Sequence, residues 1–265
     1  MKNILREFLG DSIVLSIDAN IQSIVEKYLE EACIDNECTD GGTVIIMQPK
    51  TGDILAQVTY PEYNLNEPFT INNKEIAEVW DTLNPTDKNA YLQQMWRNKA
   101  ISDTYEPGSC FKLVTASTAL EEGIVSGPDN AGEFNCSGGI EIAGVRIKCW
   151  RYYRPHGSES LRQGLMNSCN PVFMSIGLKL GKETYYNYLT ALGVSKKTGV
   201  DLPGEVNGII HSIENVTDST IASASFGQGF TLTQLNMLDV ISVYGNGGKL
   251  MKPRIVSKIT DRDGN

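Results

Sequence analysis

The stretch Tyr105-Glu106-Pro107-Gly108-Ser109-Cys110-Phe111-Lys112 places a serine and a lysine three positions apart, directly after a Pro-Gly turn. The residues that follow predict a helix over 109–122, ended by Gly123. Helix side chains three positions apart lie on one face. A lysine amine whose pKa is lowered by burial can take the proton of a serine hydroxyl and make that oxygen a nucleophile. The pattern alone is expected by chance about once in a chain of this length, so its meaning depends on its surroundings.

Composition restricts the classes of protein to be considered. The chain has 265 residues, with 41% apolar residues and a formal net charge of -9. These values are typical of a globular protein and exclude wholesale disorder. Without a basic cluster we expect no nucleic-acid partner. No apolar run approaches the roughly 20 residues of a membrane span. The six cysteines are too sparse for a disulfide scaffold, and free thiols are the default reading.

The pattern along the chain predicts helices and short strands. Residues 43–60 form two strands around a Gly-containing turn, which indicates a hairpin. A helix after Asp18 or Asn20 carries an apolar face made of Ile21, Ile24, Val25, Tyr28, Leu29 and Ala32. Residues 61–95 read as a long loop with short helical pieces, and 124–160 as irregular chain with short strands. Further helices are predicted over 161–167, 171–180, 185–192 and 231–244.

Several ordered segments resemble class B penicillin-binding proteins of the elongation or sporulation type. They are Val44 to Ala56, Asn98 to Ile101, the S-x-x-K stretch, Ser168-Cys169-Asn170, Gly199 to Glu205, and Phe226-Gly227-Gln228-Gly229. The resemblance extends from about Ile13 to Ile255. It implies an α+β fold of the kind shared with serine β-lactamases, with an antiparallel sheet between helices. It also implies one transpeptidase domain over 1–265.

The resemblance implies a peptidoglycan D,D-transpeptidase that forms a serine acyl-enzyme with stem peptides and is acylated by β-lactams. Ser109 would be the nucleophile and Lys112 the general base. Ser168 would relay a proton to the leaving D-alanine, and Asn170 would hold the acyl amide. The Ser109 amide would form half of the oxyanion hole. Gly108, Cys169, Gln228 and Gly229 are the expected substrate-binding residues. No cofactor would be required for the chemistry.

The family's third motif is K-[ST]-G on a strand that faces the serine. This chain contains two K-T-G matches, but neither lies at the expected place in the sequence. Lys50-Thr51-Gly52 lies in the early hairpin, and Lys197-Thr198-Gly199 precedes Asp201-Leu202-Pro203-Gly204-Glu205. Both match other family segments, so we interpret both as structural. The catalytic motif is expected beyond a strand that starts near Pro253, and the sequence ends at Asn265 before reaching it.

Only the first two of the family's five central strands are predicted here, which would leave an open apolar sheet edge. We therefore expect an incomplete record of a longer protein, or a chain completed by another. A lone chain should fold poorly and acylate slowly. The resemblance further implies a position on the outer face of the cytoplasmic membrane, an anchor and pedestal before Met1, and a membrane glycosyltransferase partner.

A candidate metal site consists of Cys136, Cys149, His156 and Cys169. Some class B enzymes of the elongation type carry a structural zinc between the S-x-x-K and S-x-N motifs, with ligands at similar intervals. Three thiolates and one imidazole suit tetrahedral zinc. The alternatives are a buried Cys169, a Cys136–Cys149 disulfide, or an ordinary loop histidine. His211 is expected at the surface.

Two further residues near the nucleophile received structural interpretations. Cys110 is expected to pack inward, and Glu106 to cap the turn before Ser109.

The sequence bears on three other classes of function. A serine β-lactamase shares the fold but needs a group that activates a deacylating water, and no glutamate here lies in such a motif. A β-lactam sensor or an inactive scaffold in wall synthesis would explain the missing third motif. A Ser-His-Asp hydrolase is disfavoured because no G-x-S-x-G surrounds Ser109.

Overall fold

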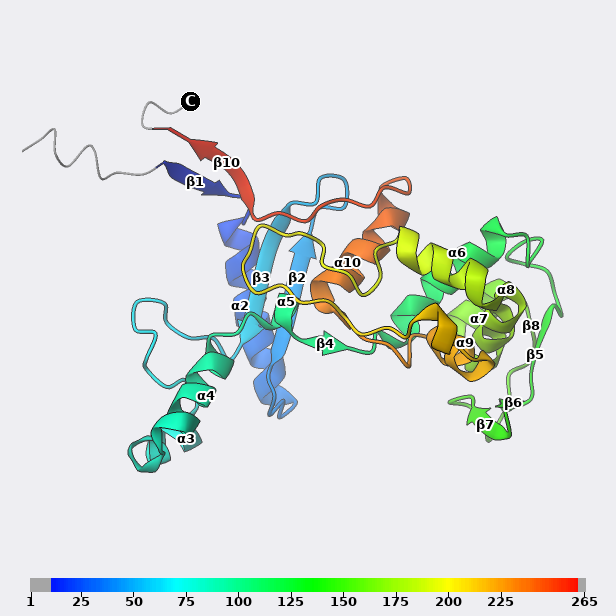
Figure 1. Cartoon of the computed structure of the whole chain (residues 1–265), viewed down its shortest axis with the longest axis horizontal. Helices are drawn as coiled ribbons and strands as arrows, with labels where there is room; N and C mark the ends of the chain where they lie inside the picture. The colour runs from blue at the N-terminus through cyan, green and yellow to red at the C-terminus, as the bar shows by residue number, and fades with distance from the viewer. Residues whose placement is uncertain (1–10, 262–265) are drawn as a thin grey trace, which may run out of the picture. The chain divides into compact units, whose positions relative to one another are not determined.

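The computed structural model describes residues 11–261 (Figure 1). The described chain forms two compact units. The first holds residues 11–103, 198–206 and 242–261, and the second holds 104–197 and 207–241. No helix in the part that the structure describes combines the length and apolarity needed to cross a bilayer.

The first unit contains a helix packed on a two-stranded sheet, with short helices beside it. Its elements are β1 (Ser12–Leu15), α2 (Ala19–Asp35), β2 (Gly42–Met47), β3 (Ile54–Tyr60), α3 (Lys74–Val79), η1 (Trp80–Thr82), α4 (Pro85–Met95), α5 (Lys99–Ser102), η4 (Val243–Gly245) and β10 (Val256–Thr260). The strands β1 and β10 pair antiparallel, as do β2 and β3.

The hairpin β2–β3 was predicted, and α2 lies along it (Figure 1). Alternate residues of β3 are buried, as expected for a strand covered on one face. Asp18 caps α2 by accepting hydrogen bonds from the next turn's backbone amides. The predicted apolar face of α2 was too wide: Ile24 and Tyr28 are 57% and 61% exposed. The less exposed residues Ile21, Val25 and Leu29 form a narrower row that ends at the buried Cys33, and the helix packs against β3.

Residues 61–95 were predicted as a long loop with short helical pieces, and the structure has a loop over 61–73 followed by the helices α3, η1 and α4. Here α4 is a regular helix of 11 residues. Asn84 caps it by accepting from the Asp87 amide, and Pro85 occupies its first turn. A proline is favoured at that position because its fixed φ suits a helix start and its missing N–H has no partner there.

The second unit is mainly helical with three small two-stranded sheets, of which only β6–β7 is a hairpin. Its elements are β4 (Thr104–Tyr105), η2 (Gly108–Phe111), α6 (Lys112–Glu121), β5 (Phe134–Cys136), β6 (Gly139–Ile142), β7 (Val145–Lys148), β8 (Gly157–Glu159), α7 (Leu161–Met166), α8 (Asn170–Ala191), η3 (Ile213–Asn215), α9 (Asp218–Ala224), β9 (Leu232–Thr233) and α10, which continues to Ser242 (Gln234–Ser242). The antiparallel pairs are β4–β9, β5–β8 and β6–β7.

The core of this unit lies around α8, which packs against α6 and α9 (Figure 1). Phe111, Phe173 and Tyr185 are fully buried there. Gly181 has φ 72° and ψ 168°, so the helical backbone is interrupted between the two segments that the sequence predicted separately. The core therefore fixes α6 and α8, the two helices that carry the candidate site at their N-terminal ends.

Candidate active site

Ser109 lies on a 3-10 turn and not within the α-helix that the sequence predicted. The turn η2 ends at Phe111, and α6 begins at Lys112. Phe111 is fully buried and packs edge-on against Phe230, with ring centroids 4.8 Å apart. Ser109 and Cys110 are exposed. The expectation that Cys110 packs inward was wrong, because the tighter turn directs Phe111 into the core instead.

The structure brings together Ser109, Lys112, Ser168 and Asn170. The Lys112 Nζ donates to Ser109 Oγ at 3.0 Å, to Ser168 Oγ at 2.8 Å and to Asn170 Oδ1 at 2.7 Å. It also lies 2.9 Å from the Ser168 carbonyl oxygen. Ser168 Oγ donates to Ser109 Oγ at 2.8 Å. A proton can therefore pass among the two hydroxyls and the amine without any large side-chain movement.

Burial makes Lys112 a usable base. Only 1% of the residue is exposed, and this desolvation lowers the pKa of its amine to about 8. Removal from water disfavours the charged ammonium more than the neutral amine. A base that is partly neutral near physiological pH can accept a proton from a serine hydroxyl during nucleophilic attack.

The S-x-N segment lies between α7 and α8. Ser160 and Gln163 form a capping box that starts α7. Asn170 begins α8, and a proline in the first turn sets the helix direction. Ser168 between them has φ 48°, a left-handed conformation that is uncommon outside glycine. This backbone turn directs the Ser168 hydroxyl toward Ser109.

A second loop, 226–229, lies against the nucleophile turn. The Gly108 amide donates to the Gly227 carbonyl at 2.9 Å, and the Gly229 amide donates to Glu106 Oε1 at 2.8 Å. Glu106 therefore joins two loops, which is more than the local cap we expected. Gln228 and Gly229 are exposed beside these contacts.

Gly227 is expected to be intolerant of any side chain. Its φ is +86°, and an added Cβ would lie 2.0 Å from the Gly108 carbonyl oxygen. We expect Gly227→Ala to lower the free energy of unfolding by about 3 kcal/mol, from backbone strain and overpacking together. Urea denaturation measures this change. Gly229→Ala is the matched control, since Gly229 has a similar φ of +80° but a Cβ added there would lie 3.6 Å from Ser223 Cβ. Equal losses in both variants would contradict the steric explanation.

The four predicted metal ligands also meet. One donor atom from each of Cys136, Cys149, His156 and Cys169 lies within 4.8 Å of the others. His156 Nδ1 is 3.7 Å from Cys149 Sγ. Two donors on one tetrahedral zinc are separated by about 3.6 Å, given usual bond lengths. All six cysteines are free, so the alternative disulfide between Cys136 and Cys149 is absent.

The chemistry of this cluster fits a bound cation. Burial raises the pKa of the Cys149 and Cys169 thiols, so these sulfurs would be neutral without a compensating positive charge. Zinc prefers thiolate and imidazole donors and deprotonates the thiols that it binds. The Cys169 side chain is fully buried and belongs to the cluster. Only the backbone of Cys169 is therefore left for its predicted contact with substrate.

Sequence reasoning missed Glu159, which is 1% exposed and lies beside the cluster. Its Oε2 is 4.0 Å from His156 Nδ1, and its Oε1 accepts from Asn167 Nδ2 at 2.6 Å. An acidic residue three positions after a candidate ligand histidine was the available signal. His211 is exposed, as predicted.

In both K-T-G segments the threonine is hydrogen-bonded to a nearby carboxylate. Thr51 Oγ1 donates to Asp53 Oδ2 at 2.7 Å within the hairpin turn. Thr198 donates to the Glu205 carboxylate through both its amide, at 2.6 Å, and its hydroxyl, at 2.7 Å. These contacts fit the structural interpretation of both segments.

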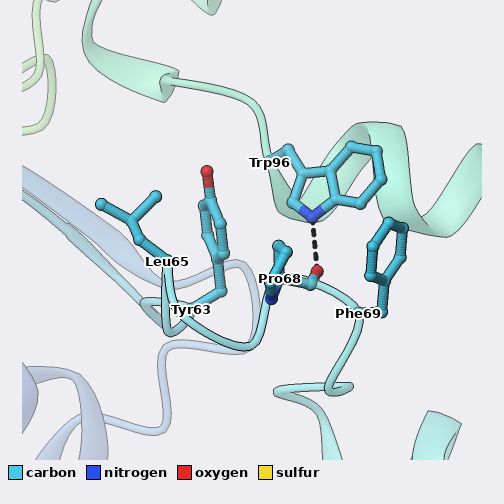
Figure 2. A pocket seen from close by; sticks show the side chains of 5 residues that line it. All are labelled: Tyr63, Leu65, Pro68, Phe69 and Trp96. Carbon is cyan, nitrogen blue, oxygen red and sulfur yellow. Dashed lines mark hydrogen bonds between the residues drawn. The ribbon is translucent and has the colours of Figure 1, made fainter. Parts of the chain in front are cut away.

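The first unit contains a pocket of about 370 Å³ that is separate from this chemistry. Figure 2 shows its apolar walls, formed by Tyr63, Leu65, Pro68, Phe69 and Trp96. The Trp96 indole N–H already donates to the Pro68 carbonyl at 2.7 Å. The lining offers neither a carboxylate nor an amine, which distinguishes this pocket chemically from the cluster at Ser109.

Comparison with known proteins agrees with the geometry. The family model described as the penicillin binding protein transpeptidase domain matches residues 42–265. Stage V sporulation protein D of Bacillus subtilis is 32% identical over 252 residues, which cover 95% of this chain and 35% of that protein. The peptidoglycan D,D-transpeptidase PbpA of Mycobacterium tuberculosis is 27% identical over 264 residues, which cover 97% of this chain and 51% of PbpA.

A solved structure shows the same fold. The crystal structure of penicillin binding protein 3 from Mycobacterium tuberculosis, complexed with aztreonam, has a TM-score of 0.77 and 26% identity. The match covers 97% of this chain and 52% of that one. The chain thus spans about a third to a half of the length of these relatives. With a family match over most of its length and the S-x-x-K and S-x-N residues gathered around one buried lysine, this chain belongs to the penicillin-binding protein transpeptidase family.

Proposed function

We propose that this chain provides a peptidoglycan D,D-transpeptidase domain, to which both units belong across 1–265. One observation carries the proposal: a buried lysine amine, with its pKa lowered to about 8, lies within 3.0 Å of two serine hydroxyls and an amide oxygen. The relatives named as peptidoglycan D,D-transpeptidases support the reaction type.

Ser109 Oγ attacks the carbonyl carbon of the penultimate D-alanine as its proton passes to Lys112 Nζ. The new Oγ–C bond gives a tetrahedral intermediate, whose oxyanion the Ser109 amide stabilises. The C–N bond then breaks, and the departing D-alanine amine receives a proton from Ser168. Lys112 returns a proton to Ser168 through their 2.8 Å contact. The amine of a second stem peptide attacks the ester carbon and loses a proton to the Lys112–Ser168 pair. The C–Oγ bond then breaks, Ser109 Oγ takes up a proton from Lys112, and the new C–N bond is the cross-link.

Substrate would be held next to these groups. Asn170 holds the acyl amide, and its contact with Lys112 at 2.7 Å supports a fixed orientation. Gly108, Gln228, Gly229 and the Cys169 backbone would line the bound peptide. The exposure of Gln228 and Gly229 beside the nucleophile turn supports this assignment.

Zinc would have a structural role only. Cys136, Cys149, His156 and Cys169 would hold it, and it would supply stability to the loop that presents Ser168 and Asn170. The acyl-transfer steps use only side chains and backbone groups of this chain and need no cofactor.

The substrates and partners follow from the reaction. Stem peptides of peptidoglycan would acylate Ser109, and β-lactams would do so as mimics. Because peptidoglycan is assembled outside the cell membrane, we place the domain on the outer face of the cytoplasmic membrane, anchored by an N-terminal segment and working with a membrane glycosyltransferase.

The intact mass of the chain, before and after penicillin, tests this function. We expect one covalent adduct, mapped to Ser109, and none on Ser109→Ala. A folded chain that gains no adduct would contradict the transpeptidase assignment and favour a scaffold. An adduct lost within seconds would instead indicate a β-lactamase, which a chromogenic β-lactam would report as turnover.

A further inference from the structure

Asn167 links the cysteine–histidine cluster to Ser168. We propose that Asn167 is a positioning residue, which transmits the geometry of the cluster to the proton-relay serine through Trp150 and Glu159. This inference rests on the proposed function for the role of Ser168. The three residues Trp150, Glu159 and Asn167 are called the Asn167 bridge below.

Glu159 holds the side chain of Asn167. The Glu159 carboxylate is buried, with 1% of its side chain exposed, and His156 beside it is 2% exposed. Glu159 Oε1 accepts from Asn167 Nδ2 at 2.6 Å, while Oε2 lies 4.0 Å from His156 Nδ1. A buried carboxylate with one oxygen toward a candidate metal ligand and the other on a second residue couples the positions of both.

Trp150 holds the backbone of the same residue. It directly follows the candidate ligand Cys149. Its ring lies edge-on against His156, with centroids 5.7 Å apart. Its indole N–H donates to the Asn167 carbonyl oxygen at 2.9 Å. Asn167 is thus hydrogen-bonded through both its side chain and its carbonyl oxygen, and both partners contact or adjoin the cluster.

Helix capping does not account for these contacts. The Asn167 backbone N–H already ends α7 by donating to the carbonyls of Gln163 and Leu165. The side-chain amide takes no part in that cap and points to Glu159. The hydrogen bond to Glu159 is therefore additional to the cap and is not needed to end the helix.

Ser168 needs such support because its backbone is strained. Its φ of 48° is unfavourable for a residue with a side chain and persists only where the surroundings hold it. Asn167 precedes it and the buried Cys169 follows it, so both neighbours are tied to the cluster. Ser168 Oγ in turn lies 2.8 Å from both Lys112 Nζ and Ser109 Oγ. A small displacement of Ser168 would break both contacts together.

The test compares Asn167→Ala with Met166→Ala in the full chain. Met166 is on the same turn, and its side chain is 78% exposed. For Asn167→Ala we expect the first-order acylation constant with penicillin to fall about 30-fold, because misplaced catalytic groups lose rate steeply. The dissociation constant of the non-covalent complex and the zinc content should match the wild type. Met166→Ala should change none of the three.

Hydrogen exchange provides a readout that does not depend on acylation. The amides of Ser168 and Cys169 donate to Leu165 and Gly164 at 3.0 and 2.8 Å. We expect their exchange to quicken about tenfold in Asn167→Ala, since local opening precedes exchange. If the wild-type chain is never acylated, the proposed function fails. Hydrogen exchange at Ser168 and Cys169 would still show whether Asn167 holds this segment in place. Unchanged hydrogen exchange at Ser168 and Cys169 in Asn167→Ala would overturn the proposal that Asn167 positions Ser168, whatever the acylation result.

Conservative variants show whether the Asn167 bridge positions Ser168 or only stabilises the metal site. Glu159→Gln keeps an oxygen that accepts from Asn167 and should retain acylation, whereas Glu159→Ala should match Asn167→Ala. Trp150→Phe keeps a ring near His156 but removes the indole N–H, and should quicken exchange at Ser168 with zinc retained. Loss of zinc in Asn167→Ala in step with its loss of rate would overturn the proposal, because Asn167 would then support the metal site and not transmit its geometry.

Discussion

Replacing Lys112 with methionine should slow acylation of Ser109 by about 1000-fold, the loss expected when a positioned general base is removed. Methionine has a similar length and suits the buried site, where Lys112 is 1% exposed. It cannot accept the hydroxyl proton or donate to Ser109, Ser168 and Asn170. Stopped-flow measurement with a fluorescent penicillin gives the acylation constant, and circular dichroism verifies that the variant is folded.

The pH profile and an arginine variant show whether Lys112 acts as a base or only as a positive charge. The active form of a base is the neutral one. Because the pKa of Lys112 is lowered to about 8, the wild-type rate should rise with pH and level off above about 8. Lys112→Arg keeps the charge but stays protonated throughout this range. It should be as slow as Lys112→Met, and substantial activity in Lys112→Arg would refute the role of base.

Removal of one cluster thiol should have the largest effect on stability. Cys136 is buried, at 1% exposure, and lies in the candidate metal site. We expect Cys136→Ser to lose bound zinc and to lower the melting temperature by about 10 °C, because the binding free energy of a structural metal adds to folding stability. Elemental analysis and calorimetry measure the two quantities.

Cys33 supplies the matched control for that variant. It is a free thiol that is also buried, at 5% exposure, but lies on α2 and is not one of the four cluster residues. Cys33→Ser should keep the zinc content of the wild type and lose far less stability. The wild-type chain should be purified with zinc in the buffer. If it then holds no metal and is no more stable than Cys136→Ser, the cluster consists of ordinary buried thiols and is not a metal site.

The sequence predicted the parts of the site that depend on spacing along the chain. Ser109 and Lys112 are three positions apart, so any tight helical turn brings them together. Ser168 and Asn170 were identified by resemblance, and the cluster of Cys136 with its partners by ligand type. The hairpin β2–β3 was predicted because its turn and strand pattern are local.

Features that depend on tertiary packing could not be predicted in this way. The periodicity of α2 could not show that Ile24 and Tyr28 stay exposed while the row ending at Cys33 is covered. The direction of Cys110 depended on a 3-10 turn, which differs from an α-helix by a small change in backbone angles. Glu159 and Asn167 are eight positions apart, and only the folding of β8 and α7 brings their side chains into contact.

Because Ser109 lies on a 3-10 turn, its two following neighbours should differ in how well they tolerate substitution. Residues three apart eclipse one another in this turn, so Ser109 lies directly beside Lys112. Of the two residues between them, Phe111 is fully enclosed, whereas Cys110 faces solvent. The proposed nucleophile therefore has an exposed neighbour that the core does not constrain. A reporter dye attached to the Cys110 thiol would lie one residue from the serine that we expect to be acylated, and it would leave the packing of Phe111 intact.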